Sequence, residues 1–117
     1  MLNGALFEII EEAGAAVLIL TEEVEQEEFI RSRLTRAEVR RQLLVMADIL
    51  AEVSAETSRR MPELEWACWK TTARALQGDT AAANEALWFA ARSLVPATIM
   101  WLRVYRQSQS GLFSFTA

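Results

Sequence analysis

The side chains in this sequence that could do chemistry are arginines, carboxylates and hydroxyls, because its 117 residues include no histidine and one cysteine. Without imidazole, the serine, cysteine and zinc chemistries that rely on histidine are excluded. Cys68 has no second cysteine with which to form an intrachain disulfide or a thiolate metal cluster, and we interpret it as a small buried apolar side chain. Any catalysis would therefore rest on these polar groups or on a bound cofactor, and we expect no cofactor.

A cluster of five arginines is the strongest candidate binding surface: Arg31, Arg33, Arg36, Arg40 and Arg41. Guanidinium groups bind phosphates and carboxylates through paired hydrogen bonds, so the arginine cluster suits RNA or an acidic partner. The alternative is a solvated surface whose arginines pair with glutamates. Residues 1–30 contain eight glutamates and no basic residue, whereas residues 31–117 contain twelve basic and eight acidic residues. Because those glutamates are numerous and near in sequence, we favour the paired surface.

An acidic set follows the first apolar segment: Glu22, Glu23, Glu25, Glu27 and Glu28. These carboxylates are candidate ligands for a divalent cation, which needs oxygen atoms that converge, usually from a shaped loop. No Asp-rich loop accompanies them. We therefore expect an acidic surface and no metal site.

Four tryptophans could stack on bases, form an interaction hot spot or pack in the core: Trp66, Trp69, Trp88 and Trp101. We favour packing in the core and in grooves between helices. Trp66 and Trp69 stand three residues apart, so they lie on one face of a helix and can cover a single patch.

Apolar residues recur at steps of three and four along most of the chain, which is typical of amphipathic helices. The first such stripe contains Leu6, Ile9, Ile10, Ala13, Val17, Leu20 and Val24. Gly14 within it is expected to permit close contact between helices. A short helix or turn is expected over 25–34, with Phe29 and Ile30 inward. The sequence Thr35-Arg36-Ala37-Glu38 is typical of a capping box, in which Thr35 begins a second long helix.

The second long helix is expected to fade before Pro62, because proline disfavours helical geometry in the residue that precedes it. Pro62 suits the first turn of a third helix, and Gly78 is a natural stop at its end. Asp79 or Thr80 then caps a fourth helix. Pro96 either kinks this helix or separates it from a fifth, which carries Ile99, Met100, Leu102 and Tyr105.

These elements predict an all-α protein, an antiparallel up-and-down bundle of about four to five helices. The length of the chain is that of one domain. We assign residues 1–106 to this single bundle domain and residues 107–117 to a C-terminal tail that is expected to be flexible. The longest run without a polar residue, Ala13–Leu20, is much shorter than the roughly 20 residues of a membrane span. We therefore expect a cytoplasmic protein with no membrane contact.

Four short segments carry a resemblance to a known family: Val39–Asp48, Met61–Trp66, Glu85–Trp88 and Leu94–Pro96. They look like Val-Ile-Arg-Asn-Leu-Glu-Ile-Ile-Gly-Glu, Pro-Glu-Ile-Pro-Trp, Glu-Ile-Val-Trp and Leu-Pro elements in the same order. In that order and spacing, the chain resembles the HEPN domains, specifically the HepT-like toxins that accompany minimal nucleotidyltransferase antitoxins. The resemblance runs over about residues 6–106 and implies the HEPN helical bundle.

Between Trp66 and Trp88 this family carries its ribonuclease motif, Arg-Asn-x-x-x-His, usually followed by x-Tyr. Its arginine and histidine are implied to act in metal-independent RNA cleavage, and its tyrosine to accept an adenylyl group. Counting back from Trp88 without a gap, the corresponding positions hold Thr72, Ala73, Gln77 and Asp79. An amide does not titrate near neutral pH, so glutamine cannot replace the histidine. The motif is degenerate, and we expect the chain not to be an enzyme.

The resemblance thus implies a non-catalytic, HEPN-like protein that acts through protein contacts in a regulatory or scaffold role. Its expected partners are a second copy of the chain, in a homodimer, or another protein such as a nucleotidyltransferase. The corresponding helix lies near the dimer cleft in this family, so at least one of Trp66 and Trp69 is expected at an interface. The alternative is an RNA-binding protein or a residual, toxin-like ribonuclease that uses the arginine cluster.

Overall fold

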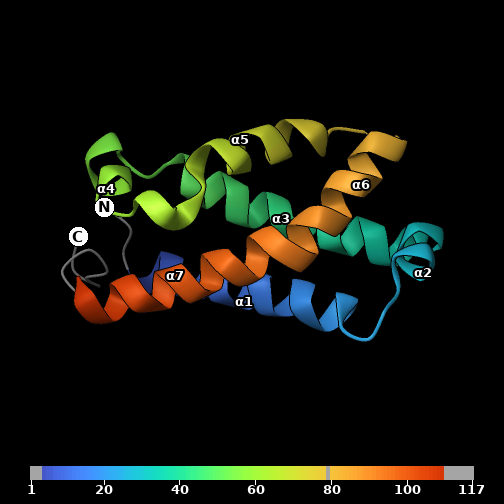
Figure 1. The fold of residues 1–117 in the computed structure, drawn as a ribbon, viewed down its shortest axis with the longest axis horizontal. Coiled ribbons are helices and arrows are strands. Elements are labelled where there is room, and N and C mark those ends of the chain that lie inside the picture. Colours follow the sequence, from blue (N-terminus) through green and yellow to red (C-terminus); the bar gives the residue numbers. More distant parts are fainter. Residues whose placement is uncertain (1–3, 79, 110–117) are drawn as a thin grey trace.

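The computed structural model describes residues 4–78 and 80–109, and every regular element within these ranges is a helix (Figure 1). In chain order the elements are α1 (Gly4–Thr21), α2 (Gln26–Arg31), α3 (Arg33–Ala51), α4 (Ala55–Arg59), η1 (Pro62–Leu64), α5 (Trp66–Ala75), α6 (Ala81–Phe89), η2 (Ala90–Leu94) and α7 (Val95–Ser108). The expected all-α class is confirmed.

The molecule measures 43 × 25 × 21 Å. Its long helices alternate in direction along the longest axis (Figure 1). The chain runs out along α1, back along α3, out along α5 and back along α6, η2 and α7. The short helix α2 turns the chain at one end, and α4 with η1 turns it at the other. This is the expected antiparallel up-and-down bundle.

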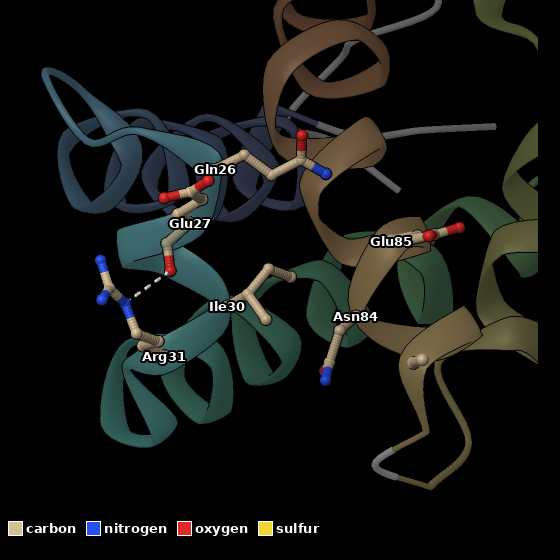
Figure 2. A pocket seen from close by; sticks show the side chains of 7 residues that line it. Gln26, Glu27, Ile30, Arg31, Asn84 and Glu85 are labelled. Carbon is tan, nitrogen blue, oxygen red and sulfur yellow. Dashed lines mark hydrogen bonds between the residues drawn. The ribbon is translucent and has the colours of Figure 1, made fainter.

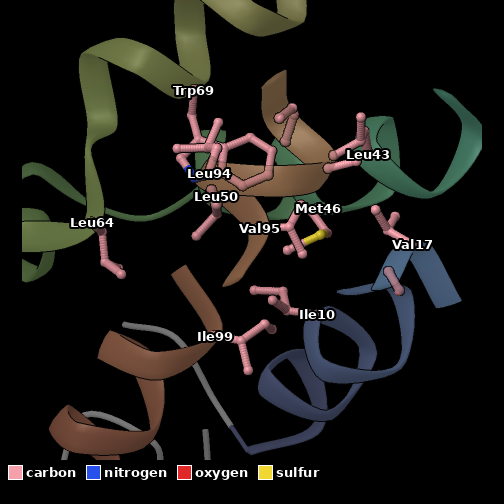
Figure 3. Close-up of a cluster of buried hydrophobic side chains, with 14 of the residues drawn as sticks. Ile10, Val17, Leu43, Met46, Leu50, Leu64, Trp69, Leu94, Val95 and Ile99 are labelled. Atoms are coloured by element: carbon pink, nitrogen blue, oxygen red, sulfur yellow. The ribbon is translucent and has the colours of Figure 1, made fainter. Parts of the chain in front are cut away.

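The core is built from apolar side chains that repeat at helical spacing and meet between the four long runs (Figure 3). Its members labelled there are Ile10, Val17, Leu43, Met46, Leu50, Leu64, Trp69, Leu94, Val95 and Ile99. Each of them is at most 6% exposed. Because each helix presents one apolar stripe, burying all four stripes together removes them from water at once.

The polar side chains at the helix starts confirm one sequence prediction and correct another. Thr80 caps α6, because its side chain accepts a hydrogen bond from the N–H of Ala83 at 3.1 Å. The capping box predicted at Thr35 is wrong. The helix α3 begins at Arg33, and its cap is Ser32, whose Oγ accepts from the N–H of Thr35 at 3.3 Å. Ser32 lies three residues before the N–H that it binds, which is the spacing a cap requires.

The second long helix is shorter than its sequence pattern suggested. It ends at Ala51, and Ser54 caps the separate helix α4 by accepting from the N–H of Thr57 at 3.2 Å. Pro62 begins η1, a 3₁₀ turn, instead of α5. Glu65 then takes a left-handed conformation with φ of 57° and ψ of 46°, which interrupts the helical run before α5.

The chain around Pro96 remains helical through a π-helical turn. The π-helix η2 joins α6 directly to α7, and Pro96 stands in the first turn of α7. Proline lacks an N–H and crowds the turn before it, and the turn directly before this proline is the wider, π-helical one. At its other end α7 continues to Ser108, so residues 107 and 108 are helical. Gln109 caps the end of α7, and residues 110–117 of the predicted tail lie outside the described residues.

Candidate functional site

The positions that the resemblance aligns with the ribonuclease motif hold side chains of different burial in the part of the chain that the structure describes. Thr72 is buried in α5, with 5% of its surface exposed. Gln77 lies just after α5 and is exposed; its Nε2 donates to the carbonyl oxygen of Ala73 at 3.4 Å. Asp79 lies outside the described residues. None of the three described side chains can transfer a proton near neutral pH.

Trp66 and Trp69 lie next to a groove of about 260 Å³ between α3 and α5. Trp69 is 3% exposed, and its Nε1–H donates to Thr98 Oγ1 at 3.0 Å, so it is a core residue that ties α5 to α7. Trp66 is half-buried and donates from Nε1 to the carbonyl oxygen of Met61 at 2.9 Å. Of the two, Trp66 is therefore the one that retains surface for an interface.

The groove beside these tryptophans exists because small residues face each other across the two helices. Ala47 and Ala51 of α3 oppose Ala73 of α5, and none of them reaches across the gap. The lining also includes Leu50 and three charged residues, Asp48, Lys70 and Arg74. Ala73, the position that the resemblance aligns with the family's asparagine, is one of the small residues that line this groove.

The structure divides the arginine cluster instead of presenting it as one surface. Arg33, Arg36 and Arg40 line a recess of about 240 Å³ on α3, since steps of three and four residues place them on one face. The guanidinium of Arg36 also donates to the carbonyl oxygen of Ile30. Arg31 belongs to α2, where its Nε donates to the carbonyl oxygen of Glu27 at 3.3 Å.

Arg41 points to a different partner, Glu38 of the same helix. Its Nη2 lies 2.7 Å from Glu38 Oε1 and its Nε lies 3.1 Å from Oε2, which is a two-point ion pair. Hydrogen bonds from Arg41 and then from Gln42 lower the pKa of Glu38 from 4.5 to about 2. The same contact raises the pKa of Arg41. Arg41 thus pairs with a glutamate of its own helix, whereas the sequence interpretation placed the partners of the arginine cluster among the glutamates of residues 1–30.

The sequence did not predict a pocket of about 600 Å³ between α2 and α6 (Figure 2). Glu27, Ile30 and Arg31 line it from α2, and Asn84 and Glu85 line it from α6. The chain runs from Arg31 at the end of α2 to Ala81 at the start of α6 before these two short helices meet, so no local pattern could have indicated their contact. The charges in the lining are mixed, with two carboxylates and one guanidinium.

A second unpredicted surface lies where α1 and α7 run side by side, and we call it the α1/α7 face. It contains a groove of about 420 Å³ lined by Leu18, Pro96, Ile99, Met100, Arg103, Val104 and Gln107. Exposed residues at steps of three and four extend it along α1: Glu8, Glu12, Ala15 and Ile19. Met100 is 51% exposed, Val104 44% and Ile19 70%. The sequence pattern predicted that Met100 is one of the apolar residues of its helix, but it did not indicate that the Met100 side chain faces solvent.

Comparisons of the chain with protein-family models, with curated proteins and with solved structures find no match. Within the described ranges, no group of three or more His, Cys, Asp or Glu side chains is arranged to hold a metal ion. No helix in 4–78 or 80–109 combines the length and the apolar character needed to cross a membrane.

Proposed function

We propose that this chain is a non-catalytic, HEPN-like helical protein that acts in the cytoplasm through contacts with other protein molecules, in a regulatory or scaffold role. The observation that carries this proposal is the α1/α7 face. Large apolar side chains stay exposed around its groove, and charged residues lie along its edges. An apolar centre with a polar rim is the arrangement found in surfaces that bind proteins.

The chemistry of the former motif positions supports binding over catalysis. Thr72 is buried, Ala73 has no functional group, and the amide of Gln77 does not titrate. The chain's one tyrosine, Tyr105, is 7% exposed in α7. A nucleotidyltransferase-type partner would therefore bind this protein without adenylylating a tyrosine.

Two assays test the absence of activity. Labelled RNA incubated with the purified protein, with and without Mg²⁺, should remain intact at the rate of a buffer blank. Mass spectrometry after incubation with a nucleotidyltransferase and ATP should show no adenylyl adduct. RNA cleavage that follows the protein peak through purification, or an adduct on Tyr105 or on a hydroxyl residue, would contradict the proposal.

The second candidate function is RNA binding through the arginine cluster, with or without residual cleavage. It is favoured by the recess in which Arg33, Arg36 and Arg40 lie together on α3. The pairing of Arg41 with Glu38 and the net charge of −4 weigh against it. RNA retention at about 50 mM salt, lost in an Arg33→Ala/Arg40→Ala variant and steeply salt-dependent, would support it. No retention at that salt concentration would exclude it.

A further inference from the structure

The helices α1 and α7 are held in a fixed antiparallel register by contacts along their whole length. The guanidinium of Arg106 lies 4.9 Å from the ring centre of Phe7, and Arg103 Nε lies 2.8 Å from Glu11 Oε1. Near the other end, Arg92 of η2, the turn that leads directly into α7, donates from Nη1 to the carbonyl oxygen of Thr21 at 3.4 Å. Residues near the end of α1 therefore lie level with residues near the start of α7. Residues near the start of α1 lie level with residues near the end of α7.

The two halves of the α1/α7 face differ in charge. The exposed side of α1 is acidic, with Glu8 and Glu12, and becomes apolar at Ala15 and Ile19. The exposed side of α7 has the matching order at the same levels. Arg103 lies near the level of Glu12, and Met100 and Pro96 lie near the levels of Ala15 and Ile19.

We propose that this face is the contact between two copies of the chain, related by a two-fold axis that runs parallel to α1 and α7. Rotation by 180° about this axis places the face of the second copy against the face of the first, with α1 of each copy along α7 of the other. The rotation leaves the position of each residue along the axis unchanged, so residues at the same level meet. Glu12 of each copy then meets Arg103 of the other, and Ala15 and Ile19 of each copy cover the other's apolar groove. This inference rests on the proposed function and names its partner.

The charges also choose between the two ways in which this face could meet a second copy. A two-fold axis lying across the helices would lay α1 against α1, which brings Glu8 and Glu12 of one copy toward Glu22 of the other. Like charges placed opposite one another oppose association. Only the axis parallel to the helices pairs each acidic edge with a basic one.

The geometry predicts an unusual rescue between two charge-reversal variants, Glu12→Arg and Arg103→Glu. Each variant alone would place like charges together twice in the dimer, because the two-fold axis repeats the pair. Each should therefore raise the dimer dissociation constant at least about tenfold. In a mixed dimer, the Glu12→Arg copy has arginine at positions 12 and 103, and the Arg103→Glu copy has glutamate at both positions. Position 12 of each copy then meets the opposite charge at position 103 of the other.

Sedimentation velocity over a series of protein concentrations is the measurement. The wild type should reach twice the 13.2 kDa mass of the chain, each variant should stay a monomer at the same concentrations, and the mixture should recover the dimer. Glu85→Arg on α6 is the matched control and should dimerise as the wild type does. Met100→Glu should dissociate the dimer without touching an ion pair, and circular dichroism of each variant checks folding, since Arg103 also pairs with Glu11.

Each other outcome has a defined meaning. A dimer that survives either charge reversal, or a mixture that stays monomeric, would overturn this arrangement while leaving self-association intact. If Arg74→Glu abolishes the dimer and the charge reversals on the α1/α7 face do not, the two copies meet instead at the groove between α3 and α5. A wild type that is monomeric at every concentration would show that a second copy is not the partner. The proposed function would then be tested by its RNA-cleavage and adenylylation assays alone.

Discussion

Gly14 of α1 lies directly against Ile99 of α7, and this contact sets how closely the two helices approach. A Cβ atom at Gly14 would stand 2.8 Å from Ile99 Cδ1 and 3.0 Å from Cγ1. Only a residue without a side chain fits there unless Ile99 moves. The expected role of this glycine as a close-contact position is therefore confirmed.

The first prediction concerns this contact. Gly14→Val should lower the free energy of unfolding by about 1–3 kcal/mol, because two methyl groups would overpack a site where Ile99 is already buried. Gly14→Ala should cost less, since Ile99 can rotate its Cδ1 and alanine gains about 1 kcal/mol of helix propensity. Urea unfolding measures both. A valine variant as stable as the wild type would contradict the close packing.

The second prediction concerns the buried hydrogen bond from Trp69 to Thr98. Thr98→Val keeps the shape of the side chain but removes the acceptor, which leaves a buried indole N–H unpaired. The free energy of unfolding should fall by about 1–3 kcal/mol. Thr98→Ser keeps the hydroxyl and is the matched control, with a smaller loss for one methyl group. If serine costs more than valine, packing and not the hydrogen bond stabilises this site.

The third prediction separates the two candidate caps of α3. Ser32→Ala should lower the free energy of unfolding by about 1 kcal/mol, because the N–H of Thr35 loses its side-chain acceptor. Thr35→Val leaves that acceptor in place and should cost less, although it removes the contact between the two hydroxyls at 2.8 Å. Thermal or urea unfolding compares them. If Thr35→Val lowers the free energy of unfolding more than Ser32→Ala does, Thr35 and not Ser32 is the residue that caps α3.

The fourth prediction concerns the titration of Glu38. Its pKa is lowered to about 2 by hydrogen bonds from Arg41 and Gln42. A carboxylate whose pKa is lower in the folded state stabilises that state above its ordinary pKa of 4.5, and this contribution is lost as pH falls toward 2. An NMR titration of the Glu38 carboxyl carbon should show the low midpoint at low salt. In Arg41→Ala the midpoint should rise toward 4.5, whereas Arg33→Ala should leave it unchanged.

The helices and several of their ends could be predicted from local sequence. Apolar steps of three and four predicted the long helices. The third of them was expected to stop at Gly78, but α5 ends at Ala75 with Leu76 as its cap, and Gly78, with φ of 89°, lies in the connection that follows. The cap of α3 could not be chosen from sequence, because Ser32 and Thr35 both have a hydroxyl at a suitable spacing. The end of α3 at Ala51 was missed for a related reason, since the apolar pattern continues through Val53.

The candidate sites were predicted less well, because they depend on which helices become neighbours. The arginine cluster is contiguous in sequence, yet Arg31 and Arg41 bind acceptors one helical turn away, Glu27 and Glu38, on different helices. The pocket between α2 and α6 and the α1/α7 face join segments that are far apart in the chain. No local pattern contains that information.

The sequence by itself determined that the chain is helical, that each long helix has a face to bury, and that no histidine is present for catalysis. Only the tertiary structure decided which of these faces meet. An apolar stripe requires burial but does not specify its partner, and a helix with a wide stripe can bury only part of it. Ile99 is therefore enclosed against Gly14, while Met100, the next residue, remains half exposed on the surface where we expect a second copy to bind.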